Sequence, residues 1–319
     1  MKKNLFLKLV SVLLILASMV TLVACSTDDK DGDKVEEEMQ VTEKGLTFSL
    51  TPNGMGYNLL SARDCEEENI VIPATYGSQG LPVTGIVKTA FGENSTMKSI
   101  YIPEGVTYLY AETFKECTAL EKIEVAEANP DYTSVDGCLY DKEVTTLLRC
   151  PPAKQETTFT LPETVVKIDK EALLRYKNLK NIVLNDGLKK IGDFAFSCCE
   201  NLESITFPDS VDTIGEAAFQ LCMSMRSVTF GSGFKTRDTV NAEGEVTRYV
   251  QEIGKFAFYF CDDIVSINYN GTVADFEALN IDVSCFLSTV LTDKVTCTDG
   301  SMTLPKLEGK LELPAYIGK

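Results

Sequence analysis

The 319-residue chain contains no histidine and no tryptophan. Without histidine, the Ser-His-Asp and Cys-His forms of nucleophilic catalysis and every imidazole metal site are excluded. The sequence also lacks a Walker loop, a dinucleotide-binding fingerprint and a Cys-x-x-Cys pair. Glycan sites usually cluster aromatic side chains, so the absence of tryptophan counts against one. The composition does not exclude a hydrolase that uses a pair of carboxylates, because 47 Asp and Glu residues are present.

Residues 1–24 have the pattern of a secretory signal peptide. Lys2, Lys3 and Lys8 form a basic start, and residues 9–23 form an apolar stretch that is short for a membrane-spanning signal anchor. The following Leu22-Val23-Ala24-Cys25 resembles a bacterial lipobox, in which the cysteine becomes the acylated first residue of the mature protein. The sequence therefore predicts export and a lipid anchor on Cys25 at the bacterial cell surface.

Residues 25–44 are polar and acid-rich, which predicts a flexible tether. A calcium loop beginning at Asp29 would need glycine at Lys34 and glutamate at Gln40, so no metal site is expected there. The whole chain has a net charge of −17, and removal of residues 1–24 leaves 27 basic and 47 acidic residues, a charge of −20. This excess of acid argues against nucleic acid as a partner.

A 23-residue pattern is written six times between residues 81 and 269. We take as position 0 the residue at Phe91, Phe114, Leu173, Phe196, Phe219 and Phe258. Five other columns hold an apolar residue in every copy: −8 (Val83, Val106, Val165, Leu188, Val211, Val250), −5 (Ile86, Leu109, Ile168, Ile191, Ile214, Ile253), +6 (Met97, Leu120, Leu179, Leu202, Met225, Ile264), +9 (Ile100, Ile123, Ile182, Ile205, Val228, Ile267) and +11 (Ile102, Val125, Leu184, Phe207, Phe230, Tyr269). A register of this kind indicates stacked supersecondary units.

The spacing within a copy predicts one rung of a solenoid. Positions +7 to +11 alternate, which predicts a strand with +9 and +11 facing inward. Positions −8 and −5 are three residues apart, so the chain must bend there, and Gly192, Gly215 and Gly254 are expected to supply the permissive backbone. The position 0 residue is expected to be buried against its counterparts in neighbouring rungs.

The copies resemble the BspA-like leucine-rich-repeat family of bacterial surface proteins, which alternates Ile-Gly-x-x-Ala-Phe-x-x-Cys with Leu-x-x-Ile-x-Ile/Leu-Pro. The phrase Ser134-Val135-Asp136-Gly137-Cys138-Leu139-Tyr140 is also similar to this family, and Phe276 and Leu173 are among the departures from it. The resemblance implies a leucine-rich-repeat solenoid with one short strand and one short helical turn per repeat. It also implies adhesion to host matrix proteins or to other cells.

The chain then divides into a cap over residues 45–80, a solenoid over 81–269 and a second cap over 270–319. Two insertions interrupt the register, at about 126–160, where 36 residues are added, and at 231–248, where 16 are added. Asp136-Gly137 between the β-rich runs 132–135 and 138–140 predicts a hairpin. Insertions in solenoids map to surface loops and often carry binding, although simple elaboration of the surface is an equal alternative.

Ten cysteines remain once Cys25 is assigned to the lipid anchor. Four of them share position +3 (Cys117, Cys199, Cys222, Cys261), which is typical of a small buried slot. Disulfides are common in exported proteins. The pairs to test first are Cys138 with Cys150 and Cys285 with Cys297.

The leading hypothesis is a non-catalytic surface lipoprotein that recognises an extracellular protein. The caps are too small for a catalytic domain, so we expect no enzyme, no cofactor and a monomer. The outward strand positions +8 and +10 are mostly small and polar, and Tyr101, Lys122 and Glu124 are the candidate contacts because aromatic and long polar groups dominate hot spots. The alternatives are a glycan- or solute-binding lipoprotein of an uptake system and a hydrolase with two converging acids.

Overall fold

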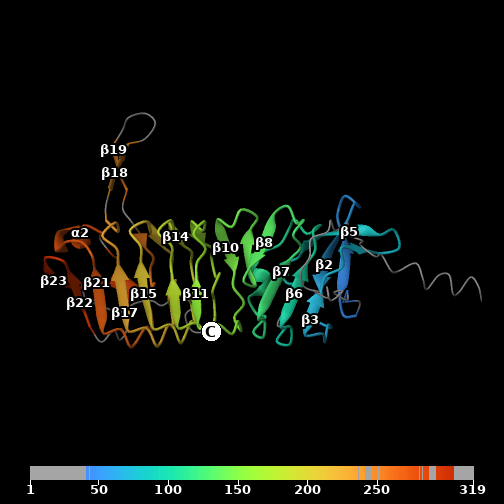
Figure 1. Ribbon diagram of the computed structural model, residues 1–319, viewed down its shortest axis with the longest axis horizontal. Helices are drawn as coiled ribbons and strands as arrows, with labels where there is room; N and C mark the ends of the chain where they lie inside the picture. The colour runs from blue at the N-terminus through green and yellow to red at the C-terminus, as the bar shows by residue number, and fades with distance from the viewer. Residues whose placement is uncertain are drawn as a thin grey trace, which may run out of the picture. The chain divides into compact units, whose positions relative to one another are not determined.

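The structure is a computed structural model that describes residues 41–304, except 43, 93, 236, 241–245, 250–251, 280, 282 and 287–291. The chain divides into two units, residues 1–39 and 40–319, and all elements described below belong to the second. Cys25 and the predicted signal peptide lie outside the described residues. Within the second unit the rungs are stacked in chain order, as the strand labels from β3 to β23 show (Figure 1).

The +9 column forms a row of parallel strands, grouped in three sheets, which we call ladder 1. Its registers pair equivalent positions, for example Ile205 with Val228 and Val228 with Ile267. The antiparallel strand β23 (Gly300–Thr303) closes the far edge. The parallel members are β3 (Asn69–Val71), β6 (Ser99–Ile102), β7 (Lys122–Val125), β11 (Thr158–Thr160), β13 (Asn181–Val183), β15 (Ser204–Phe207), β17 (Ser227–Phe230), β21 (Ser266–Tyr269) and β22 (Lys294–Cys297).

The −5 residues of the Leu173, Phe196, Phe219 and Phe258 rungs form a second parallel ladder, ladder 2, so each of these four rungs carries two short strands and not the single one expected. Its strands are only two residues long in four rungs, because the chain turns immediately after position −5. These are β12 (Lys167–Ile168), β14 (Lys190–Ile191), β16 (Thr213–Ile214) and β20 (Glu252–Ile253), joined at one end by β10 (Thr146–Arg149). The core lies between the ladders, since Ile191 of ladder 2 and Ile205 of ladder 1 belong to one buried cluster.

The N-terminal segment forms a separate four-stranded sheet in the order β1-β2-β5-β4. The strand β5 ends at Ile86, which is the −5 residue of the first rung, and pairs in parallel with β2. The sheet therefore covers the first rung, as a cap must. Its strands are β1 (Thr47–Leu50), β2 (Tyr57–Ser61), β4 (Thr75–Tyr76) and β5 (Leu81–Ile86).

The position 0 side chains stack as expected. Phe219 is fully buried and lies parallel to Phe196 at 4.8 Å and to Phe258 at 5.2 Å between ring centroids. The backbone around them also pairs between rungs, since the Phe196 amide donates to the Ala218 carbonyl at 2.7 Å. Rungs therefore stay in register at three places: two ladders and the turn.

Most of these turns are not helical. Positions −2 and +2 adopt the left-handed region in the Phe196 rung (Phe194, φ 56°; Cys198, φ 60°), and the same positions do so in the Leu173, Phe219 and Phe258 rungs. Among the turns that the structure describes, 3-10 helices end at position 0 in two places, η1 (Ala111–Phe114) and η2 (Val283–Phe286).

The glycines after position −5 are required for a reason other than the one expected. None of Gly192, Gly215 and Gly254 adopts a positive φ, so the bend itself does not need glycine. A Cβ on Gly215 would instead lie 2.5 Å from the backbone nitrogen of Asp193 in the preceding rung. These glycines allow adjacent turns to approach each other closely.

The described residues contain rungs that the sequence register misses. The Cys150 amide donates to the Ala172 carbonyl at 2.6 Å, as position 0 does elsewhere, and Phe159 of β11 pairs with Ile182. Cys150 lies 23 residues before Leu173, so the 36 added residues are one complete rung plus 13 others. The segment 126–160 is therefore mainly a turn of the solenoid and not a surface loop.

A similar rung lies inside the segment predicted as the C-terminal cap. Phe286 stacks on Phe258 at 4.8 Å, and Val295, at +9 from Phe286, pairs with Ile267. The short helices α2 (Val273–Glu277) and η2 (Val283–Phe286) connect the two rungs, and the Thr272 side chain caps α2. The Phe column thus extends one rung further than the sequence indicated.

The predicted hairpin is present as β8 (Tyr132–Val135) and β9 (Cys138–Asp141). Its turn residues Asp136 and Gly137 both have positive φ, at 49° and 74°, which is the type I′ geometry that suits a two-residue hairpin. The strand β9 is buried on both faces: Cys138 and Tyr140 pack in one core cluster and Leu139 in the other. The hairpin is thus a partition between two hydrophobic cores, one in each half of the solenoid.

The second insertion also forms an antiparallel hairpin, β18 (Arg237–Val240) with β19 (Val246–Tyr249), and these strands pair only with each other. The ten described cysteines are all free thiols, including both pairs singled out in the sequence. The +3 thiols do more than fill space, because Cys222 donates to the position 0 carbonyl of Phe196 at 3.2 Å. Cys138 and Cys150 are fully buried and hydrogen-bonded to each other.

Candidate functional site

Ladder 1 is interrupted between β7 and β11 and again between β13 and β15, and the hairpin occupies the first of these breaks. The edge of β7 that would face the next strand of the ladder is hydrogen-bonded to the hairpin. The Ile123 amide donates to the Gly137 carbonyl at 2.9 Å, and the Val125 amide donates to Ser134 Oγ at 3.2 Å. The strand β11 pairs only with β13. The two halves of the ladder are therefore separated at this level.

The separation leaves a groove of about 690 Å³, which we call the junction groove. It is walled by β7 on one side, by β11 on the other and by the hairpin turn. Its lining residues are Glu121, Lys122, Glu124, Ser134, Asp136, Gly137, Lys154, Gln155, Glu156, Thr158, Phe159 and Thr160. Four of these are acidic and two are basic, so both signs of charge are presented to a partner.

Lys154 fixes one end of the groove. Its side chain is only 9% exposed, and its ammonium donates to the Asp136 carbonyl at 2.7 Å and pairs with Glu156 at 2.9 Å. Burial lowers the pKa of Lys154, but the hydrogen bond with Glu156 and the neighbouring negative groups together outweigh burial and leave the pKa raised. The same bond lowers the pKa of Glu156. Lys154 thus holds the hairpin turn against the chain that leads into β11.

The structure brings together two of the three candidate contacts and places the third beside them. Lys122 and Glu124 both line the junction groove, and they pair with each other at 2.6 Å. Tyr101 lies one strand away, on β6 opposite Glu124, and does not line the groove. Partial burial, then Glu104 and Glu124, raise the pKa of Tyr101.

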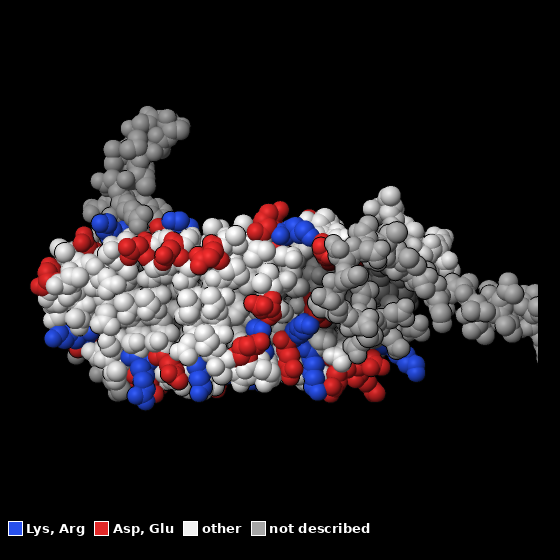
Figure 2. All heavy atoms as spheres, viewed as in Figure 1, with Lys and Arg blue, Asp and Glu red and all other residues white. Residues whose placement is uncertain are grey.

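The rest of ladder 1 presents a plainer surface. Ser204 and Thr206 pair with Ser227 and Thr229, so that small hydroxyl side chains follow each other along the outward positions. Charged side chains gather around the level of β7 and β11, whereas few lie over β15, β17 and β21 (Figure 2). The junction groove is therefore where charge and concavity coincide on this face.

Glu156 of the groove is not set up as a general acid. A general acid needs a carboxyl pKa raised toward neutrality, and Glu156 has its pKa lowered by Lys154. No group of three metal-ligating side chains occurs among the residues that the structure describes. In the same part of the chain, no helix has the length and apolar character needed to cross a bilayer. The arrangement suits binding by charge and shape.

The sequence contained a signal for the missed rung that forms one wall of the groove. Phe159-Thr160-Leu161-Pro162 repeats the Ile-x-Phe-Pro phrase of the +9 strand, and it lies 23 residues before Ile182. The column was hidden because Cys150 replaces phenylalanine at position 0 and Arg149 replaces alanine at −1. No sequence pattern indicated that Asp136 of the hairpin turn and Glu156 would lie in the same groove.

Comparison with known families gives one match. The model for the BspA type leucine-rich-repeat region matches residues 63–140, 153–241 and 242–302, with six copies of the repeat. The first matched segment includes the partition hairpin, and the gap before the second, residues 141–152, contains β10 and Cys150. Comparison with curated proteins finds no match.

Several solved structures are similar in part. A leucine-rich-repeat protein from Eubacterium ventriosum has 24% identity and a TM-score of 0.49, covering 70% of this chain, which spans only 65% of that protein's length. The pneumococcal vaccine antigen PcpA has 17% identity and a TM-score of 0.44, covering 73% and 67%. A leucine-rich cell-surface protein from Faecalibacterium prausnitzii has 16% identity and a TM-score of 0.38, covering 77% and 99%. Likenesses at this level establish no ligand.

Proposed function

Since the chain belongs to the BspA-type leucine-rich-repeat family, we propose that it is a surface-anchored module that binds an extracellular protein through the junction groove. Repeats of this family are typically non-catalytic binding modules. The protein acts in adhesion, to host matrix proteins or to other cells, and it is held at the bacterial surface by the lipid on Cys25. The partition hairpin creates the binding site by separating β7 from β11.

The observation that carries the proposal is the break in ladder 1 between β7 and β11. A continuous parallel ladder presents a flat row of small hydroxyl groups, which offers little to a specific partner. At the break, long charged side chains from β7, the hairpin and β11 surround one concavity. A concave site lets a partner side chain lose its water on several sides at once, which is the setting in which hot spots form.

The charges of the groove indicate what the partner presents. Lys122 and Lys154 already have carboxylate partners at 2.6 and 2.9 Å, whereas Glu121 accepts only a long hydrogen bond from Gln155, at 3.4 Å, among the contacts described. Asp136 adds an exposed carboxylate at the hairpin turn. The groove therefore favours a partner that inserts a lysine or arginine side chain.

The alternative, a glycan-binding lipoprotein of an uptake system, is less well supported at this groove. Phe159 is the single aromatic residue that lines it, and that ring is only 5% exposed. A sugar ring would find no open aromatic face there.

The test is a binding screen with residues 26–319, which include the whole of the compact second unit. This fragment is applied to arrays of matrix proteins and of glycans. The variant Lys122→Ala with Glu124→Ala should weaken binding to the matched protein at least about tenfold, a loss of about 1.4 kcal/mol. The matched control is Lys167→Ala with Asp169→Ala, which removes another exposed ion pair (2.8 Å) from ladder 2.

Equal binding by the groove variant and the control variant would show that the groove is not the site. Binding to glycans alone that the groove variant loses would replace the proposal with its alternative. Membrane attachment is tested separately with full-length Cys25→Ala, which should leave the membrane fraction; complete retention there would refute the lipid anchor.

A further inference from the structure

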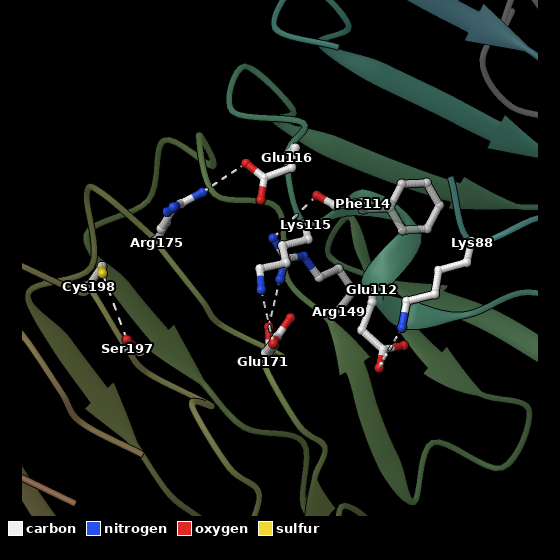
Figure 3. A network of polar contacts seen from close by, with 10 residues as sticks. All are labelled: Lys88, Glu112, Phe114, Lys115, Glu116, Arg149, Glu171, Arg175, Ser197 and Cys198. Atoms are coloured by element: carbon white, nitrogen blue, oxygen red, sulfur yellow. Dashed lines mark hydrogen bonds and ion pairs between the residues drawn. The ribbon is translucent and has the colours of Figure 1, made fainter. Parts of the chain in front are cut away.

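A second hollow lies on the turn side of the solenoid, where the Cys150 rung is recessed. Arg149, Cys150, Pro151 and Pro152 are all buried, so this rung has no outward turn. The turns on either side reach across it: Lys115 pairs with Glu171 at 3.3 Å, and Arg175 pairs with Glu116 at 3.2 Å (Figure 3). These ion pairs connect the Phe114 rung to the Leu173 rung over the one between.

The hollow is a pocket of about 500 Å³, which we call the turn pocket. It is within the size range of small-molecule sites, roughly 300–1,000 Å³. Its lining residues are Arg63, Lys88, Thr89, Gly92, Glu112, Thr113, Lys115, Glu116, Lys170 and Glu171. None of them lines the junction groove.

Basic side chains outnumber acidic ones around this pocket, against the strongly acidic balance of the whole chain. Its lining has four basic and three acidic residues, and Arg149 and Arg175 contact the backbone or carboxylates of lining residues from behind. The three carboxylates each have a partner: Glu171 and Glu116 as above, and Glu112 with Lys88 at 3.9 Å. Arg63 and Lys170 make no ion pair with the residues described.

Arg149 adds a buried charge that no carboxylate in the described structure directly pairs. It is 1% exposed and donates to two backbone carbonyls, of Glu171 at 2.6 Å and of Phe114 at 3.4 Å (Figure 3). Its Nε has no partner, and neither do Glu171 Oε2 and Thr113 Oγ1 in the pocket wall, where Thr113 is 3% exposed. Of these atoms, the Thr113 hydroxyl can donate a hydrogen bond to a ligand, and the charge of Arg149, partly offset by that of Glu171, adds to the positive field at the pocket.

Two exposed tyrosines stand beside the pocket. Tyr108 and Tyr110 are 50% and 41% exposed, pack edge to face at 5.2 Å and share a hydrogen bond between their hydroxyls. Lys88, which lines the pocket, places its ammonium 5.9 Å from the centre of the Tyr110 ring. An aromatic surface therefore adjoins the basic lining.

We propose that the turn pocket binds an acidic oligosaccharide, with a carboxylate or sulfate group among Arg63, Lys88 and Lys170 and a sugar ring against Tyr110. The cations supply attraction, and the tyrosine supplies an apolar face that a free small anion would not use. This site is distinct from the junction groove and takes a ligand of opposite charge. The partition hairpin opens the junction groove, and the recessed Cys150 rung opens the turn pocket.

The test uses residues 26–319 and titration calorimetry with four probes: tetragalacturonate, neutral maltotetraose, hexaglutamate and inorganic phosphate. Tetragalacturonate should bind and maltotetraose should not, and binding should weaken as salt rises from 50 mM to 200 mM. Lys170→Glu should raise the Kd at least about tenfold, and Tyr110→Ala should also raise it. The matched control is Lys190→Glu, which reverses an exposed lysine on ladder 2 and should leave the Kd unchanged.

Each other outcome overturns part of the proposal. No binding of tetragalacturonate, or binding that Lys170→Glu leaves intact, would refute the site. Binding of hexaglutamate in preference to tetragalacturonate would replace the sugar with an acidic peptide, and equal affinity for phosphate with no effect of Tyr110→Ala would reduce the site to a general anion pocket. The Lys122→Ala and Glu124→Ala variant should keep full affinity, which separates this result from that of the groove.

Discussion

Removal of one ring from the phenylalanine column should destabilise one half of the solenoid and spare the other. Phe219 is fully buried between Phe196 and Phe258, with ring planes 7° and 5° from parallel. Phe219→Ala leaves a cavity that stacked rungs cannot close, because both neighbours are held by ladder hydrogen bonds. We expect a loss of about 3–5 kcal/mol in the free energy of unfolding.

A second variant separates ring stacking from burial. Phe219→Leu keeps most of the apolar volume but loses two stacked pairs, each worth about 0.5–1.5 kcal/mol, so it should cost about 1–3 kcal/mol. The control is Val265→Ala, because that side chain is 56% exposed and its truncation should change stability by less than about 0.5 kcal/mol. Urea unfolding followed by circular dichroism gives the free energies.

The location of the loss tests the partition between the two cores. Amide hydrogen exchange of Phe219→Ala should accelerate in β14, β15, β16 and β17, whose inward side chains belong to the same core cluster. Exchange in β6 and β7 should stay unchanged, because their inward side chains belong to the other cluster. A cost below about 1 kcal/mol, or equal acceleration in both halves, would refute the reasoning.

Three further results are expected. Gly215→Ala should lower the free energy of unfolding in urea by about 1–3 kcal/mol, because its Cβ would overlap the backbone of the preceding rung. Gly187→Ala should cost less, because the nearest contact of its Cβ is a side-chain oxygen at 3.3 Å. The reverse order would contradict the close-approach explanation. Burial raises the pKa of Asp141, but hydrogen bonds from two threonines outweigh burial and hold the pKa below its usual value. The resulting stabilisation is present above the unfolded pKa of about 3.9 and is lost as pH falls through the folded pKa. The loss of stability in Asp141→Asn should therefore be largest at pH 7 and shrink by pH 3. In thiol labelling of the native 26–319 fragment, the half-buried Cys198 should react first, and Cys198→Ser should remove that phase. The reason is that burial raises the pKa of thiols such as Cys199 to about 12, which leaves a thiolate fraction of about 10⁻⁴ at pH 8. Equally fast labelling of Cys199 would contradict this explanation.

The strict columns made the fold predictable from sequence. A solenoid repeats one environment, so the same residue type is required at the same offset, and Ile205, Val228 and Ile267 could be assigned to inward strand positions without coordinates. The type I′ hairpin was equally legible, because Asp136-Gly137 is one of the few dipeptides that tolerate two positive φ values. Local backbone chemistry and periodic burial are properties that a sequence carries directly.

The candidate site was less predictable for the opposite reason. Lys122 and Glu124 were identified from their outward register, but their place in a groove depends on Gly137 accepting the hydrogen bond that a next strand would otherwise take. Arg149 gave no sign of its role, since its burial follows from its position in a rung whose phenylalanine is replaced by cysteine. Contacts between residues so far apart in the chain leave no local pattern.

By itself, the sequence determined the repeat, the inward columns, the hairpin and the acidic balance of the chain, because each depends on neighbours in the chain or on an exact period. Only the tertiary structure decided that the segment around Cys150 is a rung, that β9 divides the core in two, and that the hairpin and this rung each open a hollow. The physical reason is that a break in stacking redirects backbone hydrogen bonds and leaves side chains from different rungs facing one space. Such a space belongs to the assembled rungs and to none of them alone.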